Sequence, residues 1–201
     1  MGVILDESFI ITDTSDSLER NRKEKEYMDY IYNHLANVKK AFANLFVPLL
    51  NQNYISELIS VQQFREAMQI VIPKIKVHDA SKFSDEEFDG YRAHWYPTEA
   101  ELNADEDTKF VLEEKYNDAW KHHYTNNDHH PMYWVNPDTN TIRDMELDAI
   151  IHMICDWESV SMTMNGNILD WFENNSEIER SNMTANTLNI VNDIMYNVIR
   201  R

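Results

Sequence analysis

The sequence predicts an all-α protein, and three observations support this prediction. The 201 residues include only three Gly and five Pro, fewer than the tight turns of a sheet protein usually need. Hydrophobic residues make up 43% and aromatic residues 11% of the chain, which is enough for a sizeable core in one domain. From about residue 23 onward, apolar residues recur at three- and four-residue steps, as they do on one face of a helix.

We expect two regions, an N-terminal arm at 1–22 and a helical domain at 23–201. The arm contains two short apolar stretches that lead into Thr, Ser and Asp residues. The first helix then begins near Lys23 and ends or bends at Pro48, because proline lacks the backbone N–H that a helix interior requires. Its core-facing stripe consists of Tyr27, Ile31, His34, Val38, Phe42, Leu45 and Leu49.

Five further helices bring the predicted total to about six. The second is expected to end at Pro73. The third begins at Ser84, because Ser84 and Glu87 have the spacing of a capping box. A segment rich in Asn, Asp, His and Pro, residues 125–141, is expected to form a long functional loop. The five helices are predicted at residues 55–72, 84–91, 107–124, 144–163 and 186–199.

Charge and composition limit the classes of partner. The formal net charge of −17 repels polyphosphate backbones and argues against a nucleic-acid polymer. A small phosphorylated molecule stays compatible, because a bound divalent ion inverts the local potential. The single cysteine, Cys155, excludes an intramolecular disulfide and a Cys-rich zinc module. The absence of a long apolar run or a signal-peptide pattern predicts no membrane partner and a cytoplasmic location. The amphipathic helix at 186–199 could pair between subunits and form a homo-oligomer.

Three polar residues occupy core-facing positions of different predicted helices: His34, His123 and Asp156. An ionised carboxylate buried without a partner costs at least ~2 kcal/mol, so Asp156 needs a cation or strong donors. A divalent ion held by neutral imidazoles and carboxylates would satisfy all three residues. Taken singly, such a His is most often a packed core residue, and such an Asp can cap a helix or pair with an Arg. The metal hypothesis therefore depends on their joint occurrence.

A His–Asp pair at 78–79 adds two more candidate ligands. Side chains of adjacent helical residues differ by about 100° in direction, so His78 and Asp79 can reach one point between helices. Lys82 follows at three- and four-residue spacing and projects over the same patch. Its ammonium would repel a bare ion but stabilise a phosphate bound to that ion. His152 precedes Asp156 by four residues and is expected to donate to a ligand rather than to be one.

The segment around residues 122–130 contains four histidines with Asn126, Asn127 and Asp128 between them. These polar residues favour an interruption of the helix, which would place the later two histidines on the following loop. The alternative is a solvated loop or a helix end stabilised by imidazolium groups. The pattern does not decide which member of each pair is a ligand. The four histidines are His122, His123, His129 and His130.

The order of these residues resembles the HD-domain superfamily of metal-dependent phosphohydrolases. His78-Asp79-Ala80-Ser81-Lys82 is close to the HD-x-x-K and HD-A-S forms of that superfamily. Nucleoside-monophosphate hydrolases of the superfamily tend to have Glu where this chain has Lys82. The chain also resembles an uncharacterised family (a domain of unknown function) from phages and bacteria. That second resemblance covers roughly 30–175, and its matching pieces are Tyr30–Val38, His78–Ser84, Ala119–His123, Asn127–Trp134 and Met153–Trp157.

The HD-like resemblance implies a helical bundle that holds one or two divalent ions. His34, His78, Asp79 and Asp156 would hold the first ion, which could be Mn, Fe, Co, Ni or Zn. His123 with His129 or His130 would hold a second ion, bridged to the first by Asp79. The implied activity is hydrolysis of a small nucleotide or related phosphoester. Asp79 would assist deprotonation of water, Lys82 would neutralise charge on the phosphate, and Asn126 or Asn127 would orient it.

Two other classes of function fit the same residues. A pair of iron ions on this ligand set resembles HD-type oxygenases, which cleave C–C or C–P bonds with O₂. A non-catalytic phage accessory protein, which binds a nucleotide signal or a basic surface of a host protein, is the third class; if the chain is phage-encoded, its location is the host cytoplasm. Metal content, oxygen consumption and recovery of an unchanged ligand distinguish the three.

Overall fold

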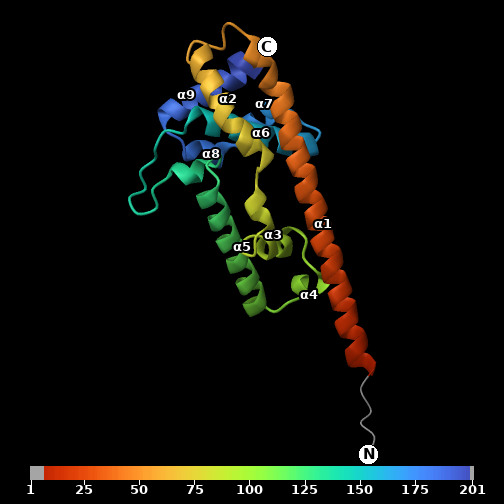
Figure 1. The fold of residues 1–201 in the computed structure, drawn as a ribbon. Helices are drawn as coiled ribbons and strands as arrows, with labels where there is room; N and C mark the ends of the chain where they lie inside the picture. Colours follow the sequence, from red (N-terminus) through yellow and green to blue (C-terminus); the bar gives the residue numbers. More distant parts are fainter. Residues whose placement is uncertain (1–6, 200–201) are drawn as a thin grey trace, which may run out of the picture. The chain divides into compact units, whose positions relative to one another are not determined.

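The computed structural model describes residues 7–199, with side chains described from Ser15 onward. This part of the chain contains nine α-helices and no β-strand, which confirms the predicted all-α class (Figure 1). It divides into two compact units, one with residues 7–32 and 81–123 and one with residues 33–80 and 124–199. The helices are α1 (Glu7–Leu45), α2 (Val61–Lys76), α3 (Phe88–Trp95), α4 (Glu99–Leu102), α5 (Glu106–Asn126), α6 (Leu147–Thr163), α7 (Ile168–Asn175), α8 (Glu177–Ser181) and α9 (Ala185–Asp193).

The second unit contains the main hydrophobic core. Helices α2 and α6 pack on each other, and α6 also packs on α7. The first turn of α2 is stabilised by a capping box, in which Ser60 and Gln63 each accept a hydrogen bond from the other's backbone N–H. Each large apolar side chain buried in such a core stabilises the fold by about 1.5–3 kcal/mol. The buried apolar side chains of α6 are Ala149, Ile150, Ile151, Met153, Ile154, Cys155 and Trp157.

The first unit depends on a close approach of two helices and on a buried cation. A Cβ atom built on Gly90 of α3 would lie 2.5 Å from the Lys115 carbonyl oxygen and 2.8 Å from the Ala119 Cβ of α5, so only glycine fits there. The Arg92 side chain is 1% exposed, and its guanidinium donates to both carboxylate oxygens of Glu101 at 2.6 Å. This bidentate pair joins α3 to α4.

Several predicted helix boundaries are wrong. Helix α1 begins at Glu7, so residues 7–22 of the expected arm are helical, while residues 1–6 lie outside the described part of the chain. Pro73 lies inside α2 instead of ending it. The Ser84 capping box does not form; α3 begins after Glu87, and residues 80–83 form a 3₁₀ turn.

The C-terminal third contains more elements than the sequence predicted. Helices α7 and α8 occupy a region without a predicted helix. The expected helix at 186–199 is α9 followed by a π-helical segment, Ile194–Ile199. None of the helices in residues 7–199 is long and apolar enough to cross a membrane.

Candidate metal centre

The candidate ligands of the second unit come from three separate segments. His34 lies on α1 in the same stripe as the buried residues Ile31 and Val38, so its ring points into the interior. His78 and Asp79 follow the end of α2. Asp79 has a φ angle of 51°, a left-handed conformation that Asp tolerates better than most residues. The third segment is α6, which provides Asp156.

Four atoms from these residues converge. The Nε2 atoms of His34 and His78 are 3.0 Å apart. His34 Nε2 lies 3.4 Å from Asp79 Oδ2 and 3.1 Å from Asp156 Oδ1. His78 Nε2 lies 3.3 Å from the same Asp79 oxygen and 3.5 Å from the same Asp156 oxygen. The His34, His78 and Asp79 side chains are at most 4% exposed, and that of Asp156 is 15% exposed.

These distances fit a common ion. Nitrogen and oxygen ligands about 2.1 Å from a divalent ion lie about 3.0 Å apart at right angles and about 3.4 Å apart at tetrahedral angles. The five separations, 3.0–3.5 Å, lie close to this interval. Two imidazoles and two carboxylates also form a donor set that suits the transition ions predicted from the sequence. His34, His78 and Asp156 could therefore hold a metal ion, and Asp79 lies beside both imidazoles.

The other ring nitrogens of both histidines have partners that orient them. Ser159 Oγ donates to the Asp156 carbonyl oxygen at 2.7 Å and lies 2.9 Å from His34 Nδ1. Because the single hydroxyl proton is used, this oxygen accepts from Nδ1–H, which leaves His34 Nε2 free of a proton. His78 Nδ1 lies 2.8 Å from His152 Nε2. Such contacts fix the tautomer and direction of metal-ligating histidines.

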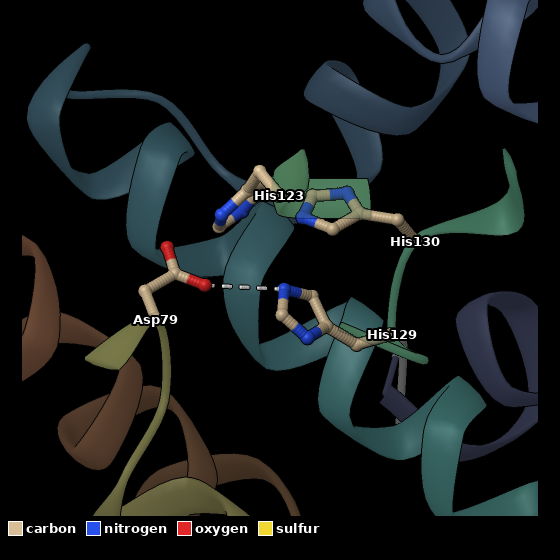
Figure 2. A group of neighbouring side chains, drawn as sticks. All are labelled: Asp79, His123, His129 and His130. Atoms are coloured by element: carbon tan, nitrogen blue, oxygen red, sulfur yellow. Dashed lines mark ion pairs between the residues drawn. The ribbon is translucent and has the colours of Figure 1, made fainter. Parts of the chain in front are cut away.

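A second set of candidate ligands adjoins Asp79. His129 Nε2 lies 3.4 Å from Asp79 Oδ1, the oxygen that the first set does not use, as the dashed line in Figure 2 shows. The rings of His129 and His130 have centroids 4.2 Å apart. Ligand atoms of Asp79, His129 and His130 lie within 4.8 Å of one another. Asp79 therefore has one carboxylate oxygen in each set.

Burial and neighbouring side chains shift the pKa values of His129, His152 and Asp156. Burial lowers the pKa of His129 to about 3, and the neighbouring His152 acts in the same direction. Burial, with the charge of His78, also lowers the pKa of His152 to about 3. For Asp156, burial raises the pKa, but the His34 and His78 side chains beside the carboxylate outweigh this effect and hold the pKa well below the usual range. His129 and His152 are thus neutral and Asp156 is ionised, the states in which such groups bind metals.

A cavity of about 260 Å³ adjoins this cluster within the second unit. Asn126 and Asn127, predicted to orient a substrate, are part of its wall. Lys74 also lines it and donates to Asp128 and, at 2.6 Å, to Asp148. Burial alone would lower the pKa of Lys74, but these two carboxylates raise it. The lining residues are Lys74, Val77, His78, Asn126, Asn127, Asp128, His129, Tyr133 and His152.

The remaining predicted site residues belong to the first unit. His123, which Figure 2 also labels, has its Nδ1 atom 2.8 Å from Glu87 Oε2, and His122 Nδ1 lies 2.7 Å from Glu87 Oε1. The Glu87 side chain is 0% exposed. Burial raises the pKa of Glu87, but the two histidines, His123 more than His122, outweigh this effect. The pKa of Glu87 is therefore lowered from its usual value. Lys82 Nζ lies 5.8 Å from the Tyr91 ring centroid.

Sequence reasoning missed several residues of both units. Ser159 gave no signal, because a serine on a helix rarely stands out, although its seven-residue spacing from His152 places the two on one face. Glu87 was assigned to a capping box and is instead a buried partner of two histidines. Lys74 was the only one with a sequence signal, as a cation in the last turn before the His78–Asp79 pair.

Fold and cluster together define an all-α protein with a buried His/Asp site that could hold a metal ion. The chain belongs to a family described as "Family of unknown function (DUF5662)", whose model matches residues 23–197. This confirms the predicted membership of an uncharacterised family, while the HD-like residue order stays a prediction. Neither the curated proteins nor the solved structures contain a match to the chain.

Proposed function

We propose that this protein is a metal-dependent hydrolase of a small phosphoester, such as a nucleotide. The observation that supports this proposal most is the convergence of His34, His78 and Asp156, with Asp79 Oδ2 3.3–3.4 Å from both imidazoles. A cavity of about 260 Å³, lined by His78 of this set and by His129, would admit a small substrate. Catalytic metal sites keep a coordination position open to water or substrate, whereas structural sites are closed.

Different residues would have different roles in this reaction. His34, His78, Asp79 and Asp156 would hold the first ion, and His129 and His130 would share Asp79 with a second. A bound divalent ion lowers the pKa of water and polarises phosphoryl oxygens. Asp79, which has one carboxylate oxygen in each ligand set, would assist deprotonation of the attacking water. Asn126 and Asn127 orient the phosphate from the cavity wall.

The roles predicted for His123 and Lys82 stay predictions. Both residues belong to the first unit, where His123 contacts Glu87 and Lys82 lies over Tyr91. If Lys82 neutralises charge on the phosphate, Lys82→Ala raises KM for phosphoesters without changing metal content. If His123 is a ligand, His123→Gln lowers the number of ions bound.

The experiment that tests the proposal combines metal content with turnover. Protein purified without chelator is analysed for its elements and then assayed for phosphate release from nucleotides and simple phosphoesters. We expect His78→Gln and Asp79→Asn to lose both the ion and at least 100-fold in kcat/KM. His94→Gln and Asp138→Asn are matched controls, since His94 belongs to the first unit and Asp138 is exposed.

Three results would contradict the proposal. Phosphate release that is unchanged in His78→Gln would show that the cluster is not needed for the activity. Two bound iron ions with O₂ consumption but without phosphate release would favour the oxygenase class instead. A nucleotide that binds and is recovered unchanged would favour a non-catalytic binding protein.

A further inference from the structure

His152 connects the candidate ligands to the cavity. It lies on α6, four residues before Asp156, and is 4% exposed. Its Nε2 atom lies 2.8 Å from His78 Nδ1, and the residue is also part of the cavity wall. Within residues 15–199, the buried His152 Nδ1 has no hydrogen-bond partner. A buried donor or acceptor without a partner costs about 1–3 kcal/mol, so this nitrogen indicates an external partner.

The positions of the ring protons on His78 and His152 follow from the ligand role of His78. An ion held by His78 Nε2 requires that nitrogen to be free of a proton, so the ring proton is on Nδ1. That N–H donates to His152 Nε2, which must then be the acceptor. A neutral imidazole with an acceptor Nε2 carries its proton on Nδ1. His152 therefore presents an N–H donor at the nitrogen that has no partner in the protein.

The neighbouring metal ligands indicate which chemical group meets this donor. Asn126, Asn127 and Lys74, whose ammonium donates to Asp128 and Asp148, complete the cavity wall. An N–H donor beside a bound divalent ion suits an oxyanion. The volume of about 260 Å³ lies below the ~300–1,000 Å³ of typical drug-sized ligand pockets. It suits a phosphate on a small organic group better than an extended nucleotide chain.

We propose that His152 binds the substrate phosphate through Nδ1–H while its Nε2 holds the metal ligand His78 in place, so that one residue serves both the ion and the oxyanion. This inference rests on the proposed function, because it assumes an ion at His78 Nε2. The inference goes beyond the proposed function in two ways. It gives His152 two separable roles, and it identifies the cavity as the binding site of the phosphate.

Two substitutions separate the two roles. Gln at position 152 places an amide oxygen near the position of Nε2, so His152→Gln keeps the acceptor for His78 but loses the donor to the cavity. Asn places its amide N–H near the position of Nδ1, so His152→Asn keeps the donor but loses the contact with His78. The affinity for Mn²⁺ alone and the affinity of the Mn²⁺-loaded protein for inorganic phosphate are measured by calorimetry. His94→Gln is the matched control.

We expect His152→Gln to keep its Mn²⁺ affinity within about threefold and to bind phosphate at least about tenfold more weakly. His152→Asn should bind Mn²⁺ about 10–100-fold more weakly. The control should match the unsubstituted protein in both measurements, and circular dichroism checks that each variant is folded. If the Asn variant does not fold, the phosphate affinity of the Gln variant still decides the question.

Different failures have different meanings. Phosphate affinity unchanged in His152→Gln overturns the oxyanion role even if the protein hydrolyses phosphoesters. Loss of Mn²⁺ binding in His152→Gln, equal to that in His152→Asn, overturns the separation of roles. Phosphate binding that depends on His152 in a protein without hydrolytic turnover would support the inference and contradict the proposed function.

Discussion

At the scale of single residues, the cluster depends on groups that hold the ligands as much as on the ligands themselves. The polar positions on apolar stripes, His34 and Asp156, could be found from the sequence, because a buried charge needs a partner. Ser159 could not, since its importance comes from a hydrogen bond across 125 residues of chain. Such a contact exists only once α1 and α6 are folded.

Removal of the Ser159 hydroxyl should weaken metal binding. Ser159→Ala deprives His34 Nδ1–H of its acceptor, so the ring can rotate and its tautomer is no longer fixed. We expect a loss of about tenfold in metal affinity, measured by competition with a chelating dye. Ser161→Ala is the control on the same helix, because the Ser161 hydroxyl bonds to Glu158 and not to a ligand. An affinity equal to that of the control would contradict the orienting role.

The metal-free protein should lose stability as the pH falls below about 6.5. The pKa values of His129 and His152 are lowered in the fold to about 3, so the unfolded chain binds protons there before the folded chain does. Stability conferred by these neutral rings is therefore present above pH 6.5 and declines from that pH toward 3. Urea unfolding at a series of pH values between 7.5 and 4.5 measures the slope. His152→Gln should make the slope shallower, and an unchanged slope would argue against a buried neutral ring.

At the scale of helices, the long elements could be predicted and the short ones could not. Helices α1, α2, α5 and α6 repeat an apolar stripe over at least four turns, so their existence was clear even where a boundary was wrong. Helices α7 and α8 have eight and five residues, too few turns for a periodic pattern to stand out. The capping box predicted at Ser84 does not form. A capping motif alone therefore does not start a helix.

Gly90→Ala should destabilise the first unit, although Ala favours helix more than Gly does. The new methyl group would lie 2.5 Å from a backbone oxygen of α5, so the helices must separate, at a cost of about 1–3 kcal/mol. Urea unfolding measures this loss. Gly166→Ala is the control, since the nearest atom there is 3.6 Å away. Equal stability of the two variants would contradict the close contact.

At the scale of the whole molecule, the candidate ligands link distant parts of the chain. His34, the 78–79 pair and Asp156 are far apart in sequence but belong to one unit. Composition and the helical spacing of apolar residues predicted the all-α class, because few glycines and prolines disfavour sheets. The division into two units could not be predicted, since both contain residues of α1 and of α5 and no linker separates them in the sequence.

Metal loading should raise the melting temperature of the protein. An ion that binds only the folded state stabilises it by about 2.7 kcal/mol at a free concentration 100 times its Kd. Differential scanning fluorimetry with and without chelator measures the change. The chelator should have no effect on His78→Gln, and an equal effect on both proteins would show that the ion binds elsewhere.

The left-handed backbone of Asp79 has a consequence for how the ligand should be removed. An Ala at that position combines loss of the carboxylate with a conformational penalty of roughly 1–2 kcal/mol, because its Cβ crowds the neighbouring carbonyl at positive φ. An Asn tolerates the same φ, so its effect reports the missing charge alone. The difference in unfolding free energy between the two variants measures how much the metal-binding turn is strained by its own geometry.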